Sequence, residues 1–189
     1  MVAAIQSAPV VDLAILFALF GAFMLGVMQG AIRRILGIIS IVFAFLVSAN
    51  LRGPVGDYLA DHWTQFPSGY SHLLAFLILF LALTVGFSVL IQGFYKHTEL
   101  SAAHPIMDDI VGGLLGLLQG FIVLTIAVII LGSYKMPPPF PDEIGQVRWA
   151  HDLLINQSHI EDAIRTTVVP VVVHLLSWLL PSDLVALFP

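Results

Sequence analysis

The stretch Leu13–Arg34, which reads LAILFALFGAFMLGVMQGAIRR, decides the fold class of this chain. Its first 20 residues contain no Asp, Glu, Lys or Arg, and Arg33 and Arg34 then close it. A helix needs roughly 20 consecutive apolar residues to cross a hydrocarbon core of ~30 Å. The stretch therefore predicts a membrane-spanning helix over residues 13–32.

The composition of the whole chain agrees with this prediction. Of its 189 residues, 59% are hydrophobic and 10% are charged, and the mean hydropathy of +0.99 is far above that of soluble proteins. The net charge of −5 comes without any basic run that could follow a nucleic-acid backbone, so nucleic acid is excluded as a partner. The absence of cysteine excludes a disulfide framework and thiolate chemistry.

Three further stretches lack Asp, Glu, Lys and Arg and complete a four-helix membrane domain over residues 1–135. The predicted spans cover residues 13–32, 35–51, 73–95 and 110–131. Because only Arg33 and Arg34 separate the first two spans, we expect a tight antiparallel hairpin, whose second helix ends at Arg52, Gly53 and Pro54. The fold class is thus an all-α integral membrane protein.

Residues 136–189 form a different kind of region. A proline-rich linker, MPPPFP, starts it, and residues 142–156 alternate charged and apolar side chains at helical spacing, which predicts a surface helix. The last segment, residues 161–181, reads EDAIRTTVVPVVVHLLSWLLP, and its apolar run is too short to span a membrane. We expect an interfacial helix here, with a strongly tilted fifth span as the alternative.

The basic residues in short loops set the expected topology. Arg33 and Arg34 place the first turn in the cytoplasm by the positive-inside rule. With four spans, both termini are then expected to lie outside the cytoplasm.

A pentapeptide with two glycines occurs twice, as GVMQG at residues 26–30 and as GLLQG at residues 116–120. Residues four apart share one face of a helix, and small residues there allow two helix backbones to approach closely in lipid. We therefore predict helix-packing faces on the first and fourth spans. Their members are Gly26, Gly30, Gly112, Gly116 and Gly120.

Polar side chains within the spans predict a second feature, an interhelical polar seam. It consists of Gln29, Thr84, Ser88, Gln92 and Gln119. A carboxamide in a low-dielectric site is costly unless it finds partners, so Gln29 and Gln119 are expected to pair with each other or to line a polar cavity. Alternatively, Gln29 reaches the headgroups beside Arg33.

Signatures of catalysis are absent from the sequence. The predicted spans hold no ionisable Asp, Glu, Lys or Arg, and Asp12, Asp108 and Asp109 lie at span ends, where helix capping is expected. The seven histidines show no metal-binding spacing, and no nucleophile or phosphate-binding motif occurs. We expect no enzyme, no cofactor and no metal.

Two stretches of the chain resemble the colicin V production protein (CvpA) family. They are VVDLAILFALFGAFMLGVMQGAIRRILGIIS at residues 10–40 and ELSAAHPIMDDIVGGLLGLLQGFIVL at residues 99–124, and the resemblance covers about Val11 to Gly132. Gln29 and Gln119 stand where the family usually has a basic residue before glycine, and Asp109 stands where an arginine often follows the aspartate. The resemblance implies a bacterial inner-membrane protein linked to colicin V production or export and to envelope homeostasis, and it brings no catalytic residues.

Three hypotheses for the function follow. The first is a non-enzymatic membrane scaffold or accessory subunit, which contacts the lipid bilayer and either other membrane proteins or further copies of itself. The second is a small transporter or channel that uses the polar seam. The third is an accessory subunit of a larger energy-transducing complex.

Overall fold

The computed structural model describes residues 10–63, 68–95, 105–132 and 159–188, and these residues form helices and no strands. The four long helices are α2 (Val10–Gln29), α3 (Ala31–His62), α4 (Ser68–Tyr95) and α5 (Pro105–Gly132). Each is long and apolar enough to cross a membrane, with mean hydropathies of 2.1 to 2.8 over its most apolar part. The prediction of an all-α membrane protein with four such helices is confirmed.

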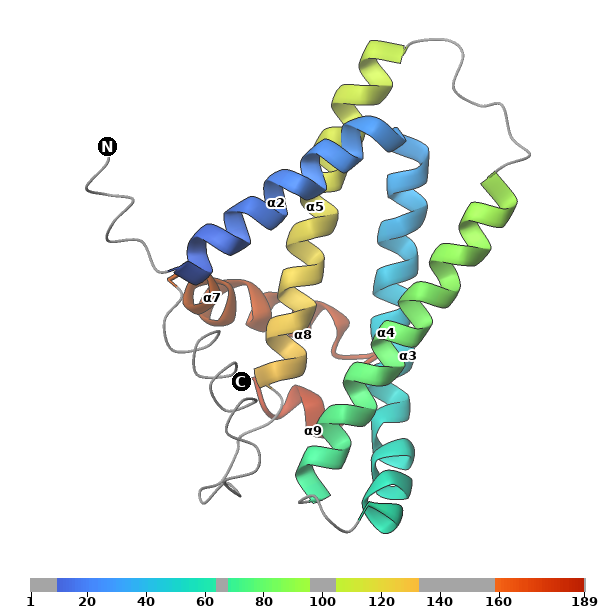
Figure 1. The fold of residues 1–189 in the computed structure, drawn as a ribbon. Helices are drawn as coiled ribbons and strands as arrows, with labels where there is room; N and C mark the ends of the chain where they lie inside the picture. Colours follow the sequence, from blue (N-terminus) through green and yellow to red (C-terminus); the bar gives the residue numbers. More distant parts are fainter. Residues whose placement is uncertain (1–9, 64–67, 96–104, 133–158, 189) are drawn as a thin grey trace.

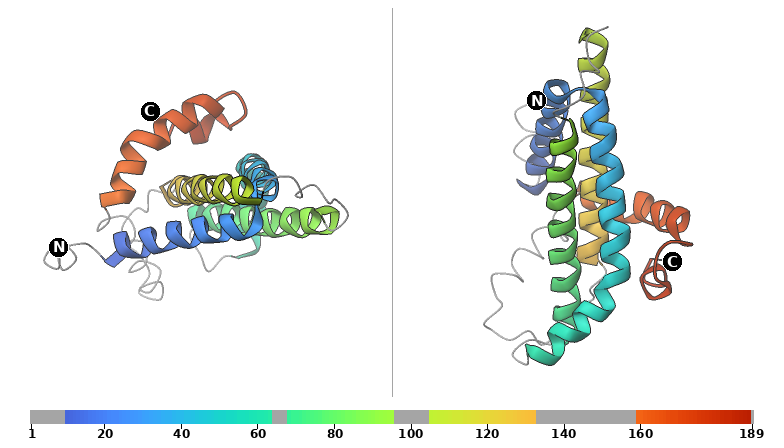
Figure 2. Two further views of the ribbon diagram at one scale, coloured as in Figure 1. Left: turned by 90° about the horizontal axis from the view of Figure 1, so that it is seen from above. Right: turned by 90° about the vertical axis from the view of Figure 1, so that its right-hand side faces the viewer.

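The helices are arranged around a central pair, α3 and α5. Helix α2 packs along α5 and helix α4 packs along α3, both on the same side of the central pair. The C-terminal helices cross the opposite side of this pair (Figures 1 and 2). The two outer helices therefore each have one main neighbour, whereas the central helices have several.

Gly30 ends α2 and precedes α3, which corrects the predicted turn. Its φ of 76° is a backbone conformation that glycine adopts without steric cost, and the Asp108 Oδ1 atom accepts a hydrogen bond of 2.9 Å from the Ala31 backbone N–H. Arg33 and Arg34 lie inside the first turns of α3 and do not separate the helices. The expected tight hairpin is also wrong, because α2 and α3 diverge from Gly30 (Figure 1).

Helix α3 continues to His62, well beyond the predicted end at residue 51. Pro54 lies inside it, although proline disfavours a helix interior by about 3 kcal/mol. Packing against α4 accounts for the extension: Gly56 lies under the His72 ring, and the His72 Nε2 atom is 3.2 Å from the Asp57 Oδ1 atom. Tertiary contact thus overrides local propensity here.

The apolar core lies where α3, α4 and α5 meet the C-terminal helices. Phe45 and Phe76 are fully buried and stack with their ring centroids 6.0 Å apart. Ile129 from α5 and Val173 and Leu184 from the C-terminal region are equally buried in the same cluster. Burial of such side chains stabilises a fold by ~1.5–3 kcal/mol each where the alternative is exposure to water.

The C-terminal region consists of α7 (His159–Ala163), a π-helical turn (Ile164–Val168), α8 (Val169–Leu176) and α9 (Ser182–Val185). The apolar helix Ile164–Leu176 rises only about 20 Å, which is shorter than a ~30 Å hydrocarbon core. It crosses the bundle instead of running along it (Figure 2). The predicted linker and the surface helix at 142–156 lie outside the described residues.

Polar contacts tie this region to helices α2 and α3 of the bundle, and the Asn50 amide of α3 also donates a 3.0 Å hydrogen bond to the Leu179 carbonyl. The Asp12 carboxylate accepts hydrogen bonds of 3.3 Å from the backbone N–H groups of His159 and Ile160, so this aspartate caps α7. The Arg52 Nη2 atom donates a 2.6 Å hydrogen bond to Asp183 Oδ2. Partial burial raises the pKa of Asp183, but the hydrogen bond and charge of Arg52, with backbone hydrogen bonds, bring that pKa below its ordinary value.

Replacing Gly30 tests the corrected turn. We expect Gly30→Ala to lower the free energy of unfolding in detergent by at least ~1 kcal/mol, because a Cβ raises the cost of the positive φ and meets the Asp108 carboxylate. Gly21→Ala is the matched control, since no atom of another described element lies within 4 Å of its added Cβ. Equal effects of the two substitutions on thermal unfolding would contradict the assigned role of Gly30.

Candidate functional site

The backbones of α2 and α5 meet at the glycines of the repeated pentapeptide. A Cβ on Gly26 would collide with the Gly112 carbonyl group, and a Cβ on Gly116 would lie 2.8 Å from the Gly26 Cα. A Cβ on Gly120 would lie 2.9 Å from the Ala22 Cβ. The structure thus places these glycines at one helix contact of the small-residue kind.

Gly30 has a different role from the one expected for it. It touches Gly112, because a Cβ on Gly112 would lie 2.9 Å from the Gly30 carbonyl carbon. Its main contribution is the positive φ that ends α2 beside the start of α5. The helix contact and the chain reversal therefore occur next to each other.

A polar cavity of about 220 Å³, here called the arginine cavity, lies beside this contact. It is partly open to the outside and is formed by the end of α2, the start of α3, α4 and α5. Its lining residues are Leu25, Gln29, Arg33, Arg34, Gly37, Ser40, Ile41, Thr84, Ser88, Ile91 and Gln119. Four of the five predicted seam residues thus line one cavity, and the side chain of Gln92 lies outside the described set.

Arg34 is the main polar group of the arginine cavity. Only 8% of the residue is exposed, and its Nη1 atom donates a 2.8 Å hydrogen bond to Gln119 Oε1. Among the residues that the structure describes, its Nε and Nη2 atoms have no hydrogen-bond partner, and neither does the Thr84 hydroxyl. The Gln119 oxygen therefore accepts from Arg34, not from Gln29 as the expected glutamine pair would require.

The burial of Arg34 is the feature that sequence reasoning missed. The sequence predicts Arg33 and Arg34 in the turn between two spans, and arginine side chains at such positions commonly extend to the membrane surface. Because Gly30 ends α2 earlier, Arg34 falls on the inner face of α3 and points at α5. Gly37, one turn further along α3, makes room for the partner, since a Cβ there would lie 3.0 Å from Gln119 Nε2. In the sequence, the small residue Gly37 lies about one helical turn after Arg34, and this spacing is the signal that could have predicted a buried arginine.

The electrostatic character of the arginine cavity is that of a hydrogen-bond donor site. Arg33 and Arg34 both line it at the N-terminal end of α3, where the helix dipole is positive. The Ser40 hydroxyl is already used in a 2.8 Å hydrogen bond to the Leu36 carbonyl. Within the described part of the chain, no group of three or more His, Cys, Asp or Glu side chains could hold a metal ion.

The comparison with known proteins gives one match. The family model described as colicin V production protein matches residues 11–159. No curated protein and no solved structure matches the chain. The matched range includes every residue of the α2–α5 contact and of the arginine cavity.

A double-mutant cycle tests the bond between Arg34 and Gln119. We expect Arg34→Leu and Gln119→Leu to be coupled by about 1–2 kcal/mol in unfolding free energy, because each single change leaves the other polar group buried. Arg52→Leu with Gln119→Leu is the reference pair, since Arg52 bonds to Asp183 and should be additive within ~0.5 kcal/mol. Additive effects of Arg34→Leu and Gln119→Leu on the unfolding free energy would contradict a hydrogen bond between the two side chains.

Proposed function

The chain belongs to the colicin V production protein family, and from this premise we propose that it is a non-enzymatic scaffold or accessory subunit in the membrane. Its four long apolar helices make it a multi-pass membrane protein. In this proposal it lies in the bacterial inner membrane with both termini outside the cytoplasm, and it supports colicin V production or export and envelope homeostasis by holding other membrane proteins.

An unused small-residue face on α4 is the observation that carries this proposal. Ala82 and Gly86 are four residues apart on α4 and both are exposed, and no other described element comes within 4 Å of a Cβ built on Gly86. The chain uses the same kind of spacing to join α2 to α5. Since α4 buries 17% of its most apolar part and α3 buries 33%, α4 is an outer helix with a face free for another helix.

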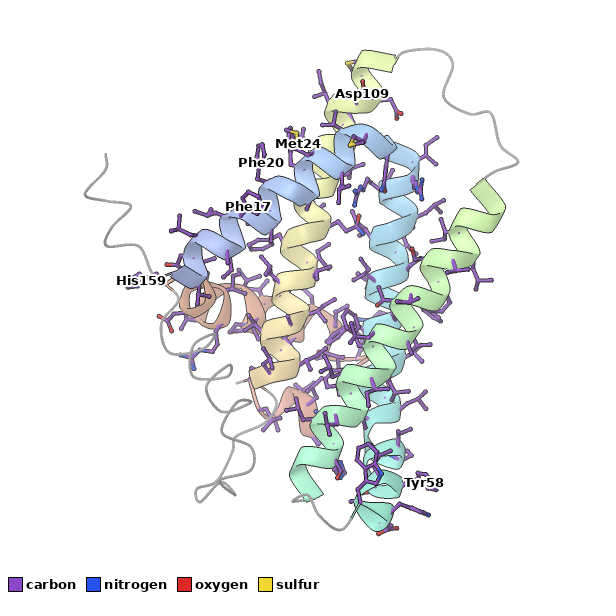
Figure 3. All side chains as sticks on the ribbon, viewed as in Figure 1. Phe17, Phe20, Met24, Tyr58, Asp109 and His159 are labelled. Atoms are coloured by element: carbon purple, nitrogen blue, oxygen red, sulfur yellow. The ribbon has the colours of Figure 1, made fainter. Side chains whose placement is uncertain are left out.

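The outer face of α2 has a different character. Phe17, Phe20 and Met24 point outward from the bundle (Figure 3), and they are 78%, 58% and 41% exposed. Large flexible or aromatic side chains keep a second backbone at a distance, and they suit contact with lipid. The face of α4 is therefore the better candidate for close contact with a partner helix.

The depth of the arginine cavity argues against the alternative of a pore. The lining residues on α3 run from Arg33 to Ile41, which corresponds to about 12 Å along the helix. A pore must cross ~30 Å of hydrocarbon. Beyond the cavity, α3 enters the apolar core at Phe45, where Phe76 and Ile129 fill the space. This arrangement supports a binding role over conduction.

Copurification tests the scaffold role. The full chain is extracted from its membrane in mild detergent, and the proteins that accompany it are quantified. We expect Gly86→Leu to reduce the accompanying partner about tenfold, equivalent to ~1.4 kcal/mol of lost helix contact. Fixed stoichiometry of the partner would favour a subunit of a larger complex over a transient scaffold.

Gly21→Leu provides the matched control for this experiment. It introduces the same side chain on α2, where nothing lies within 4 Å of the added Cβ and where Phe17 and Leu25 on the same face are already large and exposed. We expect this variant to retain its partner. If Gly86→Leu also retains it, or if the wild-type chain brings no partner along, the scaffold proposal fails.

A further inference from the structure

The buried guanidinium of Arg34 requires a counter-group that the described residues do not supply. Among the described residues, two of its nitrogen atoms have no partner and no carboxylate lies within ion-pair distance of it. In this part of the chain a neutral amide oxygen, that of Gln119, is its one hydrogen-bond acceptor. An uncompensated buried charge is strongly destabilising, so the site favours an anion.

Other donor residues line the same space. Arg33 lines the arginine cavity beside Arg34, and Thr84 lines it from α4 with a buried hydroxyl that has no partner among the described residues. The cavity also lies at the first turn of α3, where backbone N–H groups point toward the helix end, although Asp108 takes the Ala31 N–H. The planar guanidinium group of arginine matches the geometry of phosphate oxygens and binds them with charge-assisted hydrogen bonds.

The size and surroundings of the arginine cavity indicate the form of this anion. Its volume of about 220 Å³ is more than ten times what one water molecule needs, ~15 Å³. Residues of α2, α4 and the central pair line it. Helices α2 and α4 lie on the side of the central pair opposite to the C-terminal helices (Figure 2). Leu25, Ile41 and Ile91 add apolar surface to its lining, which suits acyl chains and not a free ion.

We propose that the arginine cavity binds the phosphate group of an anionic phospholipid, whose acyl chains lie against the apolar surfaces of α2 and α4. The position agrees with this ligand, because the cavity lies at the chain reversal between two membrane-length helices, where headgroups are found. This site stands on Arg34 and its cavity and does not depend on the scaffold role, which uses a different face of α4.

Lipid retention by the purified full-length chain tests the proposal. The protein in mild detergent is mixed with phosphatidylglycerol or with phosphatidylcholine, and the bound lipid is counted by native mass spectrometry. We expect wild type to retain phosphatidylglycerol about tenfold better than phosphatidylcholine, and Arg34→Gln to bring the ratio close to one. Inorganic phosphate in a parallel sample should leave the retention of phosphatidylglycerol unchanged.

Arg165→Gln is the control for net charge. It removes the same charge from an exposed side chain that pairs with Asp162 at 3.0 Å, far along the chain from the cavity. We expect it to retain the wild-type preference. Because Arg34→Gln is a buried change that can impair folding, Thr84→Val offers a milder test and should lower the preference two- to threefold.

Three results would overturn the lipid site. The first is equal retention of both lipids by wild type. The second is displacement of phosphatidylglycerol by inorganic phosphate, which would assign the cavity to a free anion. The third is an equal loss of preference in Arg34→Gln and Arg165→Gln, which would show that the preference for phosphatidylglycerol depends on the net charge of the protein and not on the cavity. The two wild-type measurements, the comparison of the lipids and the competition with inorganic phosphate, test the lipid site even if no Arg34 variant folds.

Discussion

The close approach of two backbones, α2 and α5, is the constraint on which the rest of the structure depends. Gly26 meets Gly112 and Gly116 without intervening side chains. This contact brings the end of α2 beside the start of α5, so that Asp108 can cap α3 directly after Gly30. It also fixes the rotation of α5, which turns Gln119 toward Arg34. Each pentapeptide copy therefore supplies both a contact glycine and a polar group at the cavity.

The molecule separates two kinds of interior along α3. Near Gly30 the interior is polar, and its stability depends on satisfying a buried guanidinium. Further along α3 the interior is apolar, and Phe45 packs with Phe76 and with the C-terminal helices. Two of the three aspartates predicted at the ends of spans each cap another element: Asp12 caps α7 and Asp108 caps α3. Both caps join segments that are distant in the sequence.

The sequence predicted what depends on hydropathy and missed what depends on tertiary contact. Four runs without charged residues were enough to predict four membrane-length helices, because the bilayer sets their length. Hydropathy carries no information on φ, so Gly30 was read as a helix residue although it ends α2. Arginines beside a predicted helix end are expected to reach water, and only the earlier break turns Arg34 inward. The extension of α3 past Pro54 likewise depends on packing against α4, which no local pattern encodes.

Disulfide formation between α2 and α5 tests the central contact most directly. The chain has no cysteine, so Ala22→Cys with Gly120→Cys introduces a single pair of thiols. A Cβ built on Gly120 lies 2.9 Å from the Ala22 Cβ, so a relative shift of about 1 Å between the two helices gives the ~3.8 Å that a disulfide needs. The account predicts rapid intramolecular crosslinking of this pair in native membranes under mild oxidation. Phe17→Cys with Gly120→Cys should not crosslink, because Phe17 points outward. Failure of the first pair to crosslink, or equal crosslinking of both pairs, would contradict the α2–α5 contact and the cavity built on it.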